Sequence, residues 1–150
     1  MLIKSISGVR GLVETSFTLQ TVPQYANAVH KILSDGAIIL GRDSRPSGEG
    51  ISTKIVNELV RLGRNVIDCG IVPTPTVQFM VGETDSAGGI IVTASHNPIE
   101  WNGLKFVRED GVFFFPKECE ELYSLVEKST KNNLIPRAGM YWQEKNSIQK

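Results

Sequence analysis

The residues with the clearest capacity for chemistry lie in the stretch Thr93-Ala94-Ser95-His96-Asn97-Pro98, which is followed by a lysine at position 105. An apolar run over residues 87–93 leads into Ser95 and has the length and composition of a strand that is buried on both faces. The pattern predicts a buried strand that ends by presenting the Ser95 hydroxyl, with His96 and Lys105 close behind. A serine in such a place can attack a carbonyl, carry a phosphoryl group, or only cap a helix or form a turn.

Attack on a carbonyl is the least favoured of these roles. The nucleophile elbow of an esterase needs Gly-x-Ser-x-Gly, and Thr93 and Asn97 occupy the two glycine positions. A serine hydrolase also needs a histidine base, but His96 is adjacent to Ser95, and side chains of sequence neighbours point apart. The other histidine, His30, falls inside a predicted helix. The sequence therefore disfavours a serine hydrolase.

Phosphoryl transfer depends less on a base than on cations that neutralise the moving group, and the sequence supplies such cations. Arg10, Arg42, Arg45 and Lys105 lie on segments that can surround one site. Because arginine forks onto phosphate oxygens and lysine offers a compact charge, we expect Arg10, Arg42 and Lys105 to bind phosphate. A second interpretation of Arg42 stays open, in which it forms an ion pair with Asp43 that only shapes its loop.

Several short motifs occur along the chain in a definite order. They are Gly8-Val9-Arg10-Gly11, Gly41-Arg42-Asp43-Ser44-Arg45-Pro46-Ser47-Gly48, Val72-Pro73-Thr74-Pro75-Thr76, the Ser95 stretch, and Asn102-Gly103-Leu104-Lys105. Together they resemble the α-D-phosphohexomutases, the family of phosphoglucomutase, phosphomannomutase and phosphoglucosamine mutase. The resemblance implies that Ser95 is the catalytic phosphoserine and that Arg10 and Lys105 lie beside the transferring group. It also implies that His96 is near the site and that Lys105 exchanges a proton with the sugar hydroxyl.

The reaction that the resemblance implies is the interconversion of a hexose 1-phosphate and its 6-phosphate through a bisphosphorylated sugar. We favour the phosphomannomutase or phosphoglucomutase type, with phosphoglucosamine mutase as the alternative. The implied cofactors are Mg²⁺, held here through the phosphate on Ser95, and a hexose 1,6-bisphosphate as activator and intermediate. An alternative of another class is a non-catalytic module that binds sugar phosphates, which would keep Arg10 but carry no phosphate on Ser95.

The resemblance covers the first domain of the family. Enzymes of this family have four domains, and the Asp-x-Asp-x-Asp loop that binds metal in the second does not occur in this sequence. We therefore expect residues 1–150 to be domain I, with a core over about 1–135, a tail or linker over 136–150, and domains II–IV as partners absent from this chain. Alone, the chain is expected to be inactive as a mutase and to expose apolar surface where the second domain docks.

Apolar periodicity predicts the scaffold for such a site, a three-layer α/β/α domain with a mostly parallel mixed sheet. Strands are predicted at residues 2–6, 36–40, 65–69 and 87–93, a hairpin at 103–107 and 112–115, and helices at 21–33, 48–62, 75–81 and 116–128. Thr21 with Gln24 reads as a capping box, Gly63 as a helix stop, and Asp110-Gly111 as a turn. The loops after the parallel strands meet at the carboxyl edge of the sheet, where ligands bind in this fold class.

Composition limits the remaining classes of function. The chain has 150 residues, of which 41% are hydrophobic, and its 16 basic and 16 acidic residues balance, so no bulk charge draws it to nucleic acid or to an anionic membrane. Cys69 and Cys119 lack the spacing of a disulfide framework or a zinc site, and we expect them to be small buried hydrophobic residues. No apolar run is long enough to cross a bilayer or to form a signal peptide, so we expect a cytoplasmic protein.

Overall fold

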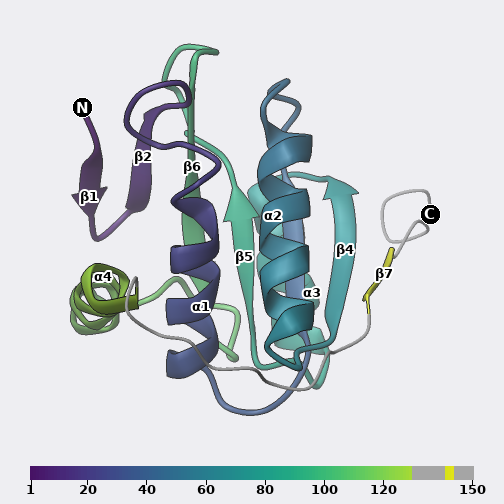
Figure 1. The fold of residues 1–150 in the computed structure, drawn as a ribbon. Coiled ribbons are helices and arrows are strands. Elements are labelled where there is room, and N and C mark those ends of the chain that lie inside the picture. Colours follow the sequence, from purple (N-terminus) through teal and green to yellow (C-terminus); the bar gives the residue numbers. More distant parts are fainter. Residues whose placement is uncertain (130–140, 144–150) are drawn as a thin grey trace.

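A mixed sheet of seven strands lies at the centre of the computed structural model, which describes residues 1–129 and 141–143 (Figure 1). The elements in chain order are β1 (Ile3–Ser5), β2 (Gly8–Leu12), α1 (Val22–Ile32), β3 (Ile38–Arg42), α2 (Gly48–Arg61), β4 (Val66–Ile71), α3 (Thr74–Glu83), β5 (Gly88–Val92), β6 (Trp101–Val107), α4 (Pro116–Ser129) and β7 (Tyr141–Gln143). None of the described helices is long and apolar enough to cross a membrane.

The strand order is β1-β2-β6-β5-β3-β4-β7, which confirms the predicted fold class. The β5-β3-β4-β7 side of the sheet is parallel, and the β1-β2-β6-β5 side is antiparallel. The antiparallel share is larger than the prediction of a mostly parallel sheet allowed, because β2 was not among the predicted strands. Two of its five residues are glycine, which has a low intrinsic strand propensity, and its ladders with β1 and β6 give it strand structure.

Helices cover both faces of the sheet and make the three predicted layers. The helices α1, α2 and α4 share one hydrophobic cluster with the sheet, which includes Leu40 and Leu104 from the strands and Ile51 and Leu122 from the helices. On the other face, α3 packs against β3 and β5 in a second, smaller cluster. All of β5 is buried, in agreement with the apolar run that predicted a strand covered on both sides. The strand that leads to Ser95 therefore lies between two helical layers.

Of the predicted helix ends, the stop after α2 is confirmed and the capping box of α1 is wrong. Gly63 follows the C-cap residue Leu62 of α2 and has a φ of 90°, so the predicted stop is confirmed. The predicted capping box of α1 is wrong, because the Thr21 hydroxyl donates to the Thr18 carbonyl oxygen at 2.8 Å and makes no bond to the helix. The reciprocal half of such a box occurs at α4 instead, where the Glu118 carboxylate accepts the Phe115 backbone N–H at 2.7 Å.

Two predictions near the C-terminal part of the chain also change. The turn at Gly111 has the expected positive φ, 85°, but residues 112–115 make only an isolated bridge between Phe113 and Val107 instead of a second strand. Pro116 begins α4 directly afterwards, so the chain must leave the sheet before a ladder can extend. The predicted tail contains β7, which pairs with β4, while residues 130–140 and 144–150 lie outside the described residues.

A buried arginine ties the end of α1 to the start of β4. Arg64 is only 5% exposed, and its guanidinium donates to the carbonyl oxygens of Leu33 and Gly36 and, at 2.8 Å, to Nδ1 of His30. An arginine is always protonated, so this bond requires a neutral imidazole. Burial and the Arg64 charge, in that order, lower the pKa of His30.

We therefore expect the free energy of unfolding to fall as the pH drops below about 6.5, the ordinary histidine value. The unfolded chain takes up a proton there, whereas the folded chain does not until the pH reaches the lowered pKa, so acid favours unfolding. Urea unfolding between pH 8 and 5.5 measures the effect. His30→Gln, which keeps an acceptor for Arg64, should flatten this dependence, and His96→Gln, at an exposed site, should leave it unchanged. An equal pH dependence in His30→Gln and the wild type would refute the assignment.

Candidate active site

Ser95 lies three residues beyond the end of β5 and is exposed. Its φ of 56° makes it the one non-glycine residue with a left-handed backbone in the described part of the chain. Such a conformation costs on the order of 1–3 kcal/mol and persists only where the surroundings impose it. Here both backbone groups are held: the N–H donates to the Thr93 hydroxyl at 3.0 Å, and the carbonyl oxygen accepts from Arg45 Nη2 at 2.9 Å. The side-chain hydroxyl is thus the one polar group of Ser95 left for chemistry.

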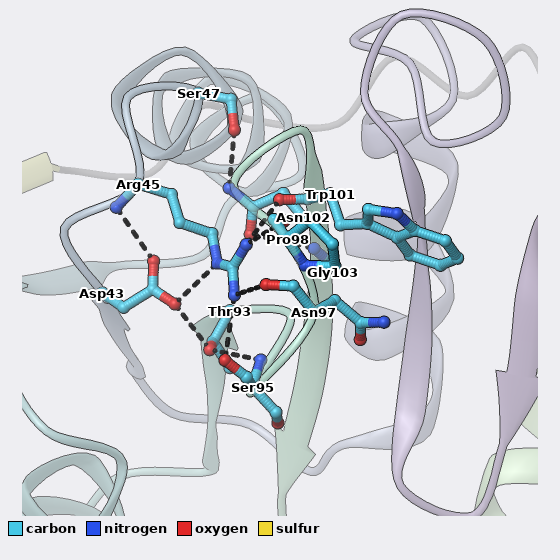
Figure 2. A network of polar contacts seen from close by, with 10 residues as sticks. All are labelled: Asp43, Arg45, Ser47, Thr93, Ser95, Asn97, Pro98, Trp101, Asn102 and Gly103. Carbon is cyan, nitrogen blue, oxygen red and sulfur yellow. Dashed lines mark hydrogen bonds and ion pairs between the residues drawn. The ribbon is translucent and has the colours of Figure 1, made fainter.

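Arg45 holds the whole Ser95 loop, residues 94–100, and not Ser95 alone (Figure 2). Its Nη1 donates to the carbonyl oxygens of Pro98 at 2.6 Å and Trp101 at 3.1 Å, and its Nη2 also donates to that of Asn97 at 2.8 Å. Four backbone carbonyls therefore converge on one guanidinium, an arrangement that we call the Arg45 clamp. Its guanidinium donors are taken up by these carbonyls, so Arg45 holds the loop in position.

Asp43 completes the clamp from the other side. Its carboxylate pairs with Arg45 Nε at 3.2 Å, and the same oxygen accepts the Thr93 hydroxyl at 2.7 Å. The ion pair in this loop is therefore formed by Arg45, whereas the sequence alone had offered Arg42 as the partner of Asp43. Through Thr93, the carboxylate also orients the hydroxyl that receives the Ser95 N–H.

A buried amide joins the same two segments on the other side of the loop. Asn102 is fully buried, and its Nδ2 donates to the Ser47 hydroxyl at 2.8 Å, at the start of α2. Its Oδ1 accepts the backbone N–H of Gly103 at 2.9 Å. Sequence reasoning offered Asp43 as a partner in an ion pair that shapes its loop, but it assigned no role to Thr93 or Asn102, although both stand in the motifs that carry the resemblance. Their short polar side chains beside predicted strand ends were the available signal.

Strand register brings Arg10 and Lys105 to a common face of the sheet. Val9 pairs with Leu104 and both belong to the core under α1 and α4, so the alternate residues Arg10, Gly103 and Lys105 face the other way. Arg10 pairs directly with Gly103, and a Cβ at Gly103 would lie 2.8 Å from the Arg10 Cα, so glycine permits this close approach. The Thr93 N–H donates to the carbonyl oxygen of the same Gly103, which places the entry of the Ser95 loop one strand away from Arg10.

Arg10 and Lys105 make few polar interactions within the described part of the chain. The Arg10 Nε is buried without a hydrogen-bond partner among the described residues, so it is a donor in need of an acceptor. The Lys105 ammonium lies 5.5 Å from the centroid of the Phe113 ring, in a cation–π contact. His96 is exposed beside Ser95. Register thus places Arg10 level with Gly103 and Lys105 opposite Ile91 of β5, and His96 directly follows Ser95 in the loop beyond β5.

Arg42 lies on the face of the sheet that α2 covers, opposite Arg10 and Lys105. It shares its strand face with Leu40, whose side chain packs under α2, and it borders the first turn of α2, with its Cδ 3.4 Å from the position of a Cβ on Gly48. Arg10 and Lys105 are on the opposite face. The structure therefore does not bring Arg42 together with the other predicted phosphate ligands.

Neither histidine is arranged as the base of a serine hydrolase. His30 lies in α1 and accepts a hydrogen bond from Arg64, and His96 makes no described bond to the Ser95 hydroxyl. The arrangement suits an exposed group carrier with a rigid backbone and nearby cations better than an activated nucleophile.

The described residues do not make a complete magnesium site. They contain no group of three or more His, Cys, Asp or Glu side chains that could hold a metal ion. The carboxylate in the Ser95 loop network, that of Asp43, is already used by Arg45 and Thr93. Within this part of the chain, Mg²⁺ would have only the oxygens of a phosphate on Ser95, and its other ligands must come from elsewhere.

Comparison with known proteins decides the family. The sequence profile of "Phosphoglucomutase/phosphomannomutase, alpha/beta/alpha domain I" matches residues 2–133. The chain belongs to this phosphohexomutase family. The probable phosphoglucosamine mutase of Pyrococcus abyssi is 34% identical over 122 residues, which are 81% of this chain and 27% of that enzyme. The phosphoglucosamine mutase of Alkaliphilus metalliredigens is 36% identical over 118 residues, 76% of this chain and 26% of the enzyme.

A solved structure gives the same result for the phosphohexomutase fold. The crystal structure of a putative phosphomannomutase from Thermus thermophilus matches with a TM-score of 0.80 and 25% identity, over 97% of this chain and 33% of that one. The chain spans about a quarter of the length of the two curated relatives, and its match in both is to domain I.

Arg45→Lys tests the clamp. A lysine keeps the charge but cannot reach four carbonyls and a carboxylate at once, so we expect the free energy of unfolding to drop by about 2–4 kcal/mol. Amide hydrogen exchange in residues 94–101 should become faster, because the loop loses its fixed shape. The matched control is Arg61→Lys on the exposed side of α2, where the pair with Glu58 should contribute about 1 kcal/mol or less. Unchanged exchange in the loop would show that Arg45 is not its main support.

Proposed function

We propose that Ser95 carries the phosphoryl group in a phosphohexomutase reaction, with this chain acting as domain I. The observation that supports this most directly is the Ser95 backbone, which is held in a left-handed conformation through both its N–H and its carbonyl oxygen. A carrier must accept and release a phosphoryl group at one fixed point, and this arrangement fixes the backbone while the hydroxyl stays exposed.

The proposed reaction has two transfers. A hydroxyl of the sugar phosphate attacks the phosphorus of phosphoserine, the bond to Ser95 Oγ breaks, and a bisphosphorylated sugar forms. After the intermediate turns around, Ser95 Oγ attacks the phosphorus of its other phosphate, the bond from that phosphorus to the sugar oxygen breaks, and the product sugar leaves with a free hydroxyl while Ser95 regains a phosphoryl group. Arg10 neutralises the phosphate oxygens, and Lys105 Nζ exchanges the proton with the sugar hydroxyl. His96 remains a candidate neighbour of the phosphate on the exposed side of Ser95.

For the sugar, we now favour an amino sugar phosphate. The sequence motifs favour glucose or mannose phosphates, but the two curated relatives described above are phosphoglucosamine mutases. The proposal is therefore conversion between glucosamine 1-phosphate and glucosamine 6-phosphate. Recognition of the sugar and the remaining magnesium ligands belong, on this proposal, to parts of the enzyme outside the 27% of its length that this chain matches.

A chimera tests the carrier role. Residues 2–133 would replace the corresponding segment of the Alkaliphilus metalliredigens phosphoglucosamine mutase, and a cooperative thermal transition would first show that the chimera is folded. We expect mass spectrometry to find phosphate on Ser95, and glucosamine 6-phosphate to remove it. Ser95→Ala should lower turnover at least about a thousandfold, because the covalent route is lost.

Ser44→Ala is the matched control for the chimera, since Ser44 is an exposed serine on the neighbouring loop and has no role in the proposed transfer. It should retain turnover and phosphate. A folded chimera with unphosphorylated Ser95 that glucosamine 1,6-bisphosphate cannot charge would support the non-catalytic binding module instead.

The isolated chain should show no measurable conversion of glucosamine 1-phosphate, with or without Mg²⁺. The reason is that its described residues offer no carboxylate cluster for the metal ion. A coupled assay for glucosamine 6-phosphate measures this, with the intact relative as the positive control. Robust turnover by the chain alone would contradict the assignment of the other functions to further domains.

A further inference from the structure

Arg42 is a cation that the proposed reaction does not use. Its side chain passes the first turn of α2, with Cδ 3.4 Å and Nη1 3.8 Å from the position of a Cβ on Gly48. It is half-buried, and within the described part of the chain its guanidinium makes no hydrogen bond or ion pair. A half-buried guanidinium with five unmatched N–H donors is unusual, because such groups are ordinarily paired.

The side chain of Arg42 lines a cavity of about 400 Å³ between α2 and the edge of the sheet formed by β4 and β7. Ser52 lines the same cavity from α2, is 5% exposed, and has a hydroxyl without a hydrogen-bond partner among the described residues. Leaving a buried hydroxyl unsatisfied is unfavourable, so it is a second group in need of a partner. The volume is many times that of one water molecule and lies within the range of small-molecule sites.

The other polar groups of this cavity indicate what would fill it. Glu49 and Asp68 contribute carboxylates, of which that of Asp68 already accepts the Gly70 N–H at 2.9 Å, and Asn57 and Gln143 contribute amides. A simple anion would meet Arg42 but also the two carboxylates, which repel it. A ligand with both an anionic and an ammonium group satisfies both signs, and hydroxyl groups on it suit the amides and Ser52.

The geometry points to a second binding site in this cavity, for a small hydroxylated zwitterion of the amino sugar phosphate class. Arg42 binds the phosphate, and Glu49 binds the ammonium group. The site lies on the α2 face of the sheet, opposite the face of Arg10 and Lys105, and uses none of the residues assigned to phosphoryl transfer. It therefore does not depend on the proposed function.

The site is tested by titrating the full 150-residue chain with glucosamine 6-phosphate. Calorimetry measures the affinity, and amide NMR shifts locate the ligand. We expect saturable binding that shifts the amides of Arg42, Ser52 and Asn57. Arg42→Gln should weaken binding about tenfold or more, and Ser52→Ala about threefold, because a charged hydrogen bond contributes more than a neutral one. Arg42→Lys, which keeps the charge, should lose less than Arg42→Gln. Native NMR dispersion in each variant separates loss of binding from loss of fold.

Two comparisons separate this cavity from the Ser95 site and from weaker ligands. Amide shifts confined to Arg10, Gly103 and Lys105, together with wild-type affinity in Arg42→Gln, would place the ligand at the Ser95 site and overturn the proposal. Glucose 6-phosphate and inorganic phosphate should bind more weakly, and Glu49→Gln should reduce the preference for the amino sugar. Equal binding of inorganic phosphate, or no saturable binding of glucosamine 6-phosphate, would also overturn it.

Discussion

The Ser95 loop joins β5 to β6 without any helix or strand of its own, so its shape depends on the Arg45 guanidinium. Backbone carbonyls repel one another when they point to one place, and only a cation with several fixed donors can gather them. Asp43 holds that cation and at the same time orients Thr93, so one carboxylate couples the end of β3 to the end of β5. The strained backbone of Ser95 persists because these bonds impose it.

The same constraint explains why the domain needs both halves of its sheet. The parallel half places the ends of β3 and β5 side by side, which lets Arg45 reach the Ser95 loop. The antiparallel half returns the chain through β6 and brings β2 beside it, which sets Arg10 against Gly103. Neither half alone would provide both the Arg45 clamp on the Ser95 loop and the position of Arg10 beside Gly103.

Strand alternation then divides the cations between the two faces. Arg10 and Lys105 stand on one face, whereas Arg42 continues the row of Leu40 on the other, under α2. Proximity in sequence therefore misleads: Arg42 and Arg45 lie on one short segment but serve different places. Arg45 supports the Ser95 loop, and Arg42 lines the cavity beside Ser52.

The sequence by itself determined the fold class, most of the helices and strands, and the position of Ser95 at the end of a buried strand. These follow from local patterns, because apolar periodicity and turn residues report which segments can bury a face. Its motifs also carried the resemblance to the phosphohexomutases, and the placement of Arg10 and Lys105 beside the phosphate stays a prediction of that resemblance. The tertiary structure alone decided the pairing of β2, the partner of Asp43 and the face on which Arg42 lies. The strand β2 depends on β6, which is distant in sequence, and its glycines hide it from local propensity. The prediction of a capping box at Thr21 was wrong because the Thr21 hydroxyl donates to the Thr18 carbonyl oxygen and makes no bond to the backbone of the helix. Long-range hydrogen bonds and strand register are properties of two segments together, so neither segment's sequence contains them.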